Sequence, residues 1–188
     1  MKKIRALIIE DEAPARELIR FMLADHPEIE VTGECGDGFC GAREIKEKRP
    51  DLIFLDIQMP KLTGFELLEV IDEKPEVIFT TAFDQYAIRA FELNAVDYLL
   101  KPFSKERFDD ALAKAVSRLE KETPADEKIE KLVATASEAE GFLTRIVFRK
   151  GAVIKIIPLN NVFYLAAEDD YVMIYYSEGK ALKPKTMK

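Results

Sequence analysis

The amino-acid sequence predicts an α/β fold, in which a five-stranded, doubly wound parallel sheet is followed by a partial all-β domain. Over the first 120 residues, amphipathic stretches alternate with short apolar runs at 4–9, 29–34, 52–55, 77–80 and 96–100. From residue 142 onward, turn residues separate strand-like runs at 145–149, 153–157, 162–165 and 171–176. The first pattern is typical of consecutive βα units, and the second is typical of antiparallel strands.

The predicted strands of the first part are buried on both faces of the sheet. Four of the five apolar runs lack the strict alternation of a strand that has one wet face. We expect helices from Pro14 onward and at 42–48, 64–71, 85–93 and 105–119, and Pro14 itself suits a first helical turn. Because ligands of such sheets bind beyond the carboxyl ends of the strands, functional residues are expected there.

Length and charge predict two domains with different partners. The 188 residues give room for one α/β domain and a smaller one. Residues 142–188 carry eight basic and four acidic side chains, a net charge of +4, whereas residues 1–141 carry −11. We therefore expect a first domain at 1–121, a partly helical linker rich in Glu, Lys and Ala at 122–141, and a second domain at 142–188.

The N-terminal residues and the cysteines favour a cytoplasmic protein without a zinc site. The first apolar run, at 6–9, is too short for a signal peptide or a membrane span, so no membrane partner is expected. Cys35 and Cys40 are the only cysteines, and the sole histidine, His26, is not near them in the sequence. We expect two free thiols.

Polar residues follow four of the predicted strands. Glu10 and Asp11 end the first strand, Asp56 the third, Thr81 the fourth and Lys101 the fifth. The ends of parallel strands share one rim, so these side chains should converge. Three carboxylates together repel one another and need a hard cation such as Mg²⁺, while a lysine and a hydroxyl can hold an anion. This combination indicates a phosphoryl-transfer site with an aspartate nucleophile.

These residues lie in four stretches: IIEDE at 8–12, LDIQMP at 55–60, TTA at 80–82 and DYLLKPF at 97–103. Together they resemble the receiver domain of two-component response regulators, over residues 3–120. The resemblance implies a flavodoxin-like fold and a phosphoacceptor rather than an enzyme, with at most slow autodephosphorylation. It also implies a sensor histidine kinase as a partner.

The resemblance further implies a role for each site residue. Asp56 accepts the phosphoryl group, and Lys101 and Thr81 contact its oxygens. Mg²⁺ is held by Glu10, Asp11, Asp56 and the main-chain carbonyl of Gln58. Tyr98 is the switch aromatic that turns inward when Thr81 moves. The face made by helix 4, strand 5 and helix 5 then forms a homodimer, and it includes Ala87, Ala90, Phe91, Val96 and Tyr98.

Two classes of enzyme share parts of this sequence pattern and offer alternative interpretations. The glycines at 36, 38 and 41 match a dinucleotide-binding fingerprint, and Asp56 lies 20 residues beyond Gly36. However, this motif follows the second strand and leaves Thr81 and Lys101 unexplained. An aspartyl phosphatase also uses an aspartate nucleophile, but it needs a second acid two residues later, where this chain has Gln58.

Residues 142–188 resemble the opening of a LytTR-type DNA-binding domain. The resemblance rests on RKG at 149–151, IPLNNVFYL at 157–165, EDDYV at 168–172 and KTMK at 185–188. It implies transcription control through DNA contacts by Arg149, Lys150, Asp169, Tyr171 and Lys185. The family's domain is longer than this segment, so the alternative is a phospho-switched interaction module that does not bind DNA.

Overall fold

The computed structural model describes residues 3–87, 90, 93–120, 144–150, 153–168 and 171–184. The chain forms two compact units, and the boundary between them lies within residues 121–143. The linker predicted at 122–141 therefore lies outside the described residues. Each unit is described here by itself.

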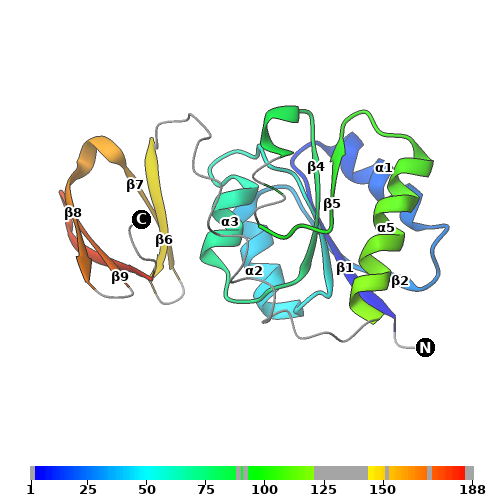
Figure 1. Ribbon diagram of the computed structural model, residues 1–188, viewed down its shortest axis with the longest axis horizontal. Coiled ribbons are helices and arrows are strands. Elements are labelled where there is room, and N and C mark those ends of the chain that lie inside the picture. Colours follow the sequence, from blue (N-terminus) through cyan, green and yellow to red (C-terminus); the bar gives the residue numbers. More distant parts are fainter. Residues whose placement is uncertain are drawn as a thin grey trace. The chain divides into compact units, whose positions relative to one another are not determined.

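The first unit is built on the predicted five-stranded parallel sheet (Figure 1). Its strands are β1 (Ile4–Ile9), β2 (Ile29–Cys35), β3 (Leu52–Leu55), β4 (Glu76–Thr81) and β5 (Asp97–Leu100). They pair in the order β2-β1-β3-β4-β5, and every neighbouring pair is parallel. All four residues of β3 are buried, as expected for a central strand with both faces covered. The predicted fold class is confirmed.

Within the described residues, four α-helices cover the two faces of this sheet. They are α1 (Ala13–Leu23), α2 (Gly38–Lys48), α3 (Gly64–Val70) and α5 (Lys105–Glu120). Figure 1 shows α2 and α3 on one face and α1 and α5 on the other. Of the helix expected at 85–93, the structure describes a 3₁₀ turn at Asp84–Tyr86 and helical backbone at residues 87 and 90. Residues 88, 89, 91 and 92, including Phe91 of the predicted dimer face, lie outside the described residues.

Side-chain caps set the starts of α2 and α3. The Asp37 carboxylate accepts a hydrogen bond from the Cys40 N–H (2.8 Å), so α2 begins four residues before its predicted start. Thr63 and Glu66 form a reciprocal capping box at α3. This box places the first turn of α3 directly after the loop that follows Asp56.

Aromatic and aliphatic side chains fill both layers between sheet and helices. On the α1/α5 face, Phe54 of β3 stacks on Phe108 of α5 with 5.3 Å between ring centroids. On the other face, Phe65 of α3 packs on Phe79 of β4 at 5.1 Å. Gly41 belongs to this layer, because a Cβ there would come within 2.9 Å of both Ile9 and Leu67. Close packing of α2 on the sheet thus accounts for a glycine of the dinucleotide-like motif.

The two cysteines are joined as a disulfide, so the expectation of free thiols is wrong. Cys35 is the last residue of β2, and Cys40 lies in the first turn of α2. The tight connection between strand and helix brings their Cα atoms to 5.6 Å, which lies within the range that a disulfide spans. Sequence spacing alone does not reveal this approach.

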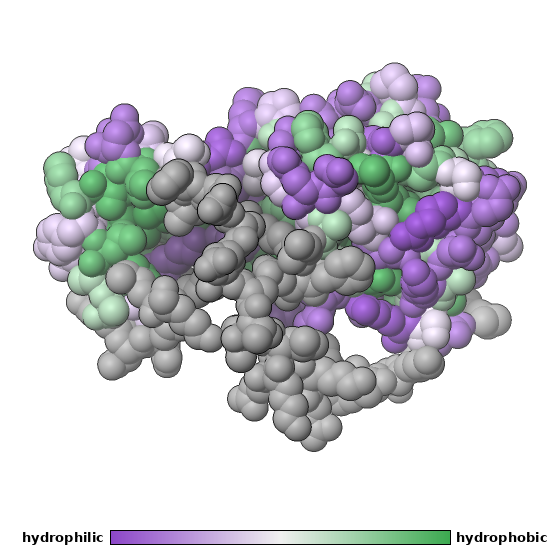
Figure 2. Space-filling view, turned by 45° about the horizontal axis from the view of Figure 1, so that its top comes forward, coloured by the Kyte–Doolittle hydropathy of each residue, from purple (hydrophilic) through white to green (hydrophobic). Residues whose placement is uncertain are grey.

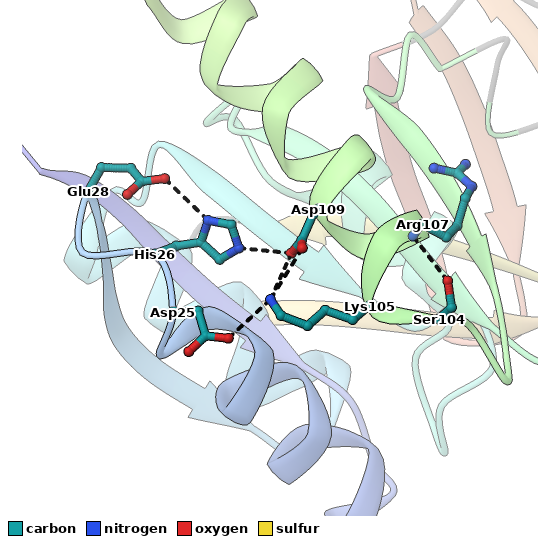
Figure 3. Close-up of polar contacts among 7 residues, drawn as sticks. All are labelled: Asp25, His26, Glu28, Ser104, Lys105, Arg107 and Asp109. Atoms are coloured by element: carbon teal, nitrogen blue, oxygen red, sulfur yellow. Dashed lines mark hydrogen bonds and ion pairs between the residues drawn. The ribbon is translucent and has the colours of Figure 1, made fainter.

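Hydrogen bonds of His26 and ion pairs of Lys105 link the loop between α1 and β2 to α5 (Figure 3). His26 Nε2 lies 2.9 Å from Asp109 Oδ1, and His26 Nδ1 lies 3.3 Å from Glu28 Oε1. Lys105 Nζ lies 3.1 Å from Asp25 Oδ2 and 3.2 Å from Asp109 Oδ2. These contacts hold α1 and α5 together on the same face of the sheet.

Asp97, the first residue of β5, anchors this strand to α5. Its buried carboxylate pairs with Arg107 (2.5 Å) and Lys114 (2.7 Å), and it accepts the Tyr98 N–H (2.8 Å). Burial raises the pKa of Asp97, but these hydrogen bonds outweigh it and lower the pKa to about 2. The strand that carries Tyr98 and ends before Lys101 is thereby held against α5.

The second unit consists of antiparallel strands. They are β6 (Arg145–Lys150), β7 (Val153–Pro158), β8 (Val162–Glu168), β9 (Tyr171–Tyr176) and β10 (Gly179–Pro184). β6 pairs with β7, and the other three form a sheet in the order β10-β9-β8. Side chains from both sheets, including Phe148, Ile157 and Ile174, share one buried cluster. The strand β10 was not predicted from the sequence.

The outer strand β8 exposes apolar side chains. Phe163 is 72% exposed, and Tyr164 and Leu165 are also exposed. Figure 2 shows apolar side chains gathered on the visible face of this unit, at the left of the view. The Tyr164 ring stacks on Tyr175 of β9 with 4.3 Å between centroids. In the described residues, β8 pairs with β9 on one side only.

Replacing Gly64 with alanine should destabilise the first unit. A Cβ at this position would overlap the main-chain carbonyl oxygen of Asp56 and press on Leu55. We expect Gly64→Ala to lower the free energy of unfolding by about 1–3 kcal/mol, measured by urea denaturation. Gly36→Ala is the control, because its nearest neighbour would lie at an ordinary 3.6 Å. Equal stability of the two variants would contradict this packing.

The Asp97 anchor should make stability depend on pH. Because folding lowers the pKa of Asp97 to about 2, its contribution is complete above the unfolded value near 4 and is lost as the pH falls toward 2. Asp97→Asn should therefore lower the free energy of unfolding by about 1–2 kcal/mol at pH 7, a range that allows for the partial exposure of Arg107 and Lys114. Below pH 4 the loss should become progressively smaller. Urea unfolding from pH 7 to pH 3 checks this, with the exposed Asp110→Asn as control. A loss independent of pH would contradict the ion-pair explanation.

Candidate functional site

Backbone hydrogen bonds extend the parallel sheet past the strand ends and assemble a rim. The Glu10 N–H donates to the carbonyl of the last residue of β2 (2.9 Å), and the Asp56 N–H donates to the last residue of β1 (2.9 Å). The Lys101 N–H donates to the last residue of β4 (2.7 Å). Residues that are far apart in the sequence thus continue the same ladders, as predicted from the parallel topology.

Three carboxylates meet on this rim. One oxygen from each of Glu10, Asp11 and Asp56 lies within 4.8 Å of the other two. Glu10 is fully buried, and Asp56 is 6% exposed. Carboxylate oxygens this close repel one another unless a cation lies between or beside them. The set is made of hard oxygen donors, which fits a divalent ion such as Mg²⁺.

Lys101 supplies the cation within the chain itself. Its ammonium lies 2.6 Å from Glu10 Oε2 and 3.4 Å from Asp56 Oδ2. Burial lowers the pKa of Lys101, but the hydrogen bond to Glu10 and the charge of Asp56 outweigh it, and the pKa is raised overall. The lysine is therefore a permanent positive charge beside the Asp56 carboxylate.

Glu10 is the acid most affected by its surroundings. Burial raises its pKa, the hydrogen bond from Lys101 lowers it, and the negative charge of Asp56 raises it again, to about 7. Its other contact is with the Glu12 N–H, which lies 3.3 Å from Glu10 Oε1. Glu10 is thus held close to Lys101 by an ion pair and to the Glu12 main chain by a hydrogen bond.

Thr81 is the last residue of β4, and its main-chain carbonyl accepts the hydrogen bond from the Lys101 N–H. The residue is fully buried, and within the described part of the chain its Oγ1 has no hydrogen-bond partner. A buried hydroxyl without a partner is costly, so an acceptor oxygen brought close to Thr81 would stabilise it, and contact with a phosphoryl group stays a prediction.

The loop after Asp56 is also held close to the carboxylate. The Gln58 N–H donates to Asp56 Oδ1 (3.2 Å), and the Gln58 side-chain amide donates to the Tyr86 hydroxyl (3.0 Å). The main chain of Gln58 therefore lies beside the acidic cluster. Metal ligation by its carbonyl oxygen stays a prediction.

Tyr98 lies half-buried on β5, beside the loop that follows β4. Its hydroxyl donates to the main-chain carbonyl of Phe83. Burial, together with the nearby charges of Asp84 and Asp56, raises the pKa of Tyr98 to about 12, so the hydroxyl stays protonated. The contact links β5 to the chain that follows Thr81, and the inward turn of the ring stays a prediction.

The predicted DNA contacts are spread over the second unit. Arg149 and Lys150 lie at the end of β6, and Tyr171 is the exposed first residue of β9. Arg149 pairs in register with a residue of β7, while Tyr171 pairs with residues of β8 and β10. Asp169 and Lys185 lie outside the described residues. The structure therefore describes three of the five residues, and DNA contact by the set stays a prediction.

Sequence reasoning missed a residue that contacts the rim from α1. Arg16 donates two hydrogen bonds to main-chain carbonyls, those of Glu10 (2.6 Å) and Asp11 (3.1 Å). Its position in the first turn of α1, five residues after Asp11, makes this contact possible. However, an arginine in an amphipathic helix ordinarily indicates only an exposed surface.

The rim therefore combines three carboxylates, a half-buried lysine and, among the described residues, a hydroxyl without a partner. Both Glu10 and Asp56 lie close to Lys101, and Asp56 is the one that follows the central strand β3. Such an arrangement can hold a divalent cation and an anion together.

Comparison with known proteins agrees with this arrangement. Residues 6–113 match the family model of the response regulator receiver domain. An uncharacterized response regulatory protein of Vibrio cholerae is 37% identical over 194 residues, which cover 98% of this chain and 74% of that protein. The transcriptional regulatory protein BtsR of Escherichia coli K12 is 36% identical over 179 residues, which cover 94% of this chain and 71% of that protein.

Solved structures show the same likeness for the first unit. The response regulatory domain of protein mrkE from Klebsiella pneumoniae aligns with a TM-score of 0.58 and 33% identity, covering 62% of this chain and 98% of that one. The REC domain of AraT, a response regulator from Geobacillus stearothermophilus, aligns with a TM-score of 0.58 and 33% identity, covering 63% and 96%. Among the described residues, no helix is long and apolar enough to cross a membrane. The chain belongs to the response regulators, and its first unit is a receiver domain.

Proposed function

We propose that this protein is a response regulator switched by phosphorylation of Asp56, with a sensor histidine kinase as donor. The observation that supports this most directly is the meeting of Glu10, Asp11 and Asp56 beside Lys101. Receiver domains are phosphoacceptors rather than enzymes in the usual sense. In the proposed reaction, the donor phosphoryl group is carried on a histidine of the kinase.

In this reaction an Asp56 oxygen attacks phosphorus, and the phosphorus–nitrogen bond of the phosphohistidine breaks. The bonding electrons stay on the imidazole, which takes a proton from solvent. When bound at Glu10, Asp11 and Asp56, Mg²⁺ neutralises charge on the phosphoryl oxygens. Lys101 lies 3.4 Å from Asp56 and can contact a second phosphoryl oxygen, while Thr81 offers its unpaired hydroxyl to another.

Phosphorylation then changes the charge at the rim. A phosphoryl group adds roughly −1.5 to −2 charge, which draws Lys101 and Thr81 toward it. When Thr81 moves, the segment from Thr81 to Phe83 moves with it. The main-chain carbonyl of Phe83 accepts the hydrogen bond from the Tyr98 hydroxyl, so this contact changes as well. Tyr98 then turns inward, and the face containing Ala87, Ala90, Val96 and Tyr98 changes shape. Phosphorylation thus shifts the equilibrium between two conformations of this face, and the favoured conformation forms a homodimer through it.

The second unit is proposed as the output that contacts DNA, through a LytTR-like arrangement of strands. Its antiparallel strands and its excess of basic residues support this, and the printed name of the relative BtsR describes a transcriptional regulator. Arg149, Lys150, Asp169, Tyr171 and Lys185 are the proposed contacts. The second candidate is a phospho-switched interaction module, which the exposed apolar side chains of β8 favour.

Labelling with a small phosphodonor tests the acceptor. With acetyl phosphate and Mg²⁺, the intact mass of the wild-type protein should rise by one phosphoryl group, and Asp56→Asn should show no rise, because an amide is not a nucleophile for phosphorus. Asp72→Asn, away from the rim, should label as the wild type does. Equal labelling of wild type and Asp56→Asn would overturn the proposal.

DNA binding by the whole chain separates the two output proposals. If basic residues neutralise DNA phosphates, binding measured by fluorescence anisotropy should be present at low salt and fall steeply as salt rises. Treatment with beryllofluoride and Mg²⁺ should strengthen this binding and raise the sedimenting mass. A mass increase without DNA binding at any salt concentration would instead support the interaction module.

A further inference from the structure

Arg16 of α1 contacts the main chain of the acidic pair rather than its carboxylates. Its Nη1 atom donates to the carbonyl oxygen of Glu10 (2.6 Å) and to that of Asp11 (3.1 Å). Hydrogen bonds from a charged donor are among the stronger ones in proteins. Two consecutive peptide groups are thus held by one side chain at the point where β1 ends.

These contacts complete the fixation of the acidic pair. The Glu10 N–H already donates to the carbonyl of Cys35 (2.9 Å), which continues the pairing of β1 with β2. Beyond Glu10 that ladder stops, and the Asp11 peptide lies past the last strand pair. Beyond this point Arg16 fixes the main chain, because it donates hydrogen bonds to the carbonyl of Glu10 and to that of Asp11.

The Arg16 side chain is itself oriented by its neighbours. Its Nε lies 3.9 Å from Glu34 Oε2 on β2, and 22% of the side chain is exposed. Arg20, one turn further along α1, contacts the other oxygen of Glu34 at 3.8 Å but is 60% exposed. The guanidinium also lies near the main chain of Gly36, where a Cβ would make an ordinary contact of 3.6 Å with Nη1.

The charge of Arg16 and its hydrogen bonds predict opposite effects on metal binding. A fixed positive charge close to a cation site repels the incoming ion, so its removal would tighten binding. Fixed peptide groups, in contrast, hold the carboxylates of Glu10 and Asp11 ready for the ion, so their release would weaken binding. Outer contacts that orient metal ligands commonly change metal affinity by about 10–100-fold.

We propose that Arg16 is a positioning residue of the acidic pocket, which fixes the main chain of Glu10 and Asp11 so that their carboxylates face Asp56 before a cation arrives. The inference rests on the proposed Mg²⁺ site. It assigns Arg16 no direct contact with metal or phosphoryl group, and it makes the two hydrogen bonds, not the charge, the reason for its effect.

The test is titration calorimetry of Mg²⁺ binding to the whole chain. Arg16→Met keeps much of the side-chain volume but loses the donors, and we expect its Kd to rise about tenfold. Arg20→Met loses its own contact with Glu34 but touches neither carbonyl, so its Kd should stay within about twofold of the wild type. Arg16→Lys keeps the charge on a shorter and differently shaped group, and it should also bind more weakly.

Each other outcome overturns the inference. Tighter or unchanged binding by Arg16→Met would show that charge repulsion dominates, and wild-type affinity in Arg16→Lys would show that charge alone matters. Equal weakening in Arg20→Met would assign the effect to Glu34. Urea unfolding in EDTA checks that the variants are folded.

A wild-type protein that binds no Mg²⁺ would contradict the proposed metal site rather than the role of Arg16. Amide hydrogen exchange in metal-free buffer then decides the question. The amides of residues 10–12 should exchange at least about tenfold faster in Arg16→Met than in Arg20→Met, because only the former loses the carbonyl contacts. Equal exchange in the two variants would overturn the inference.

Discussion

The repulsion among the carboxylates of Glu10, Asp11 and Asp56 is the constraint on which the rest of the receiver depends. Their oxygens lie within 4.8 Å of one another. Only one cation of the chain, Lys101, lies within ion-pair distance of two of the three among the described residues. The cluster therefore favours the binding of additional positive charge, and a bound cation would stabilise the negative charge of a phosphoryl group.

The sheet order makes this cluster possible. β1, which precedes the acidic pair, lies beside β3, which precedes Asp56, and parallel pairing brings their carboxyl ends together. Lys101 reaches the same rim from β5, whose position against α5 depends on the ion pairs of Asp97. Tyr98 lies on the same short strand, between Asp97 at its start and Lys101 directly after its end. Asp56 is thus linked to β5 through its contact with Lys101, and Tyr98 lies only three residues before this lysine.

Much of the receiver could be predicted from the sequence, because its signals are local or follow from topology. Fully apolar runs indicated buried parallel strands, and the residues that follow them converge by the geometry of such sheets. The start of α2 was placed too late, since the Asp37 cap lies outside the apolar pattern. The strand β10 was missed because Ala181, Leu182 and Lys183 have little preference for strands, and pairing with β9 decides their conformation.

The sequence by itself determined the α/β class, the rim and the identity of its five polar residues, because backbone period and strand direction suffice to place them. Only the tertiary structure decided which groups lie beside them. The joining of Cys35 to Cys40, the hold of Arg16 on the acidic pair and the ion pairs of Asp97 each depend on how a helix packs against a strand end. Such contacts are set by side-chain reach across elements, and no spacing along the chain encodes them.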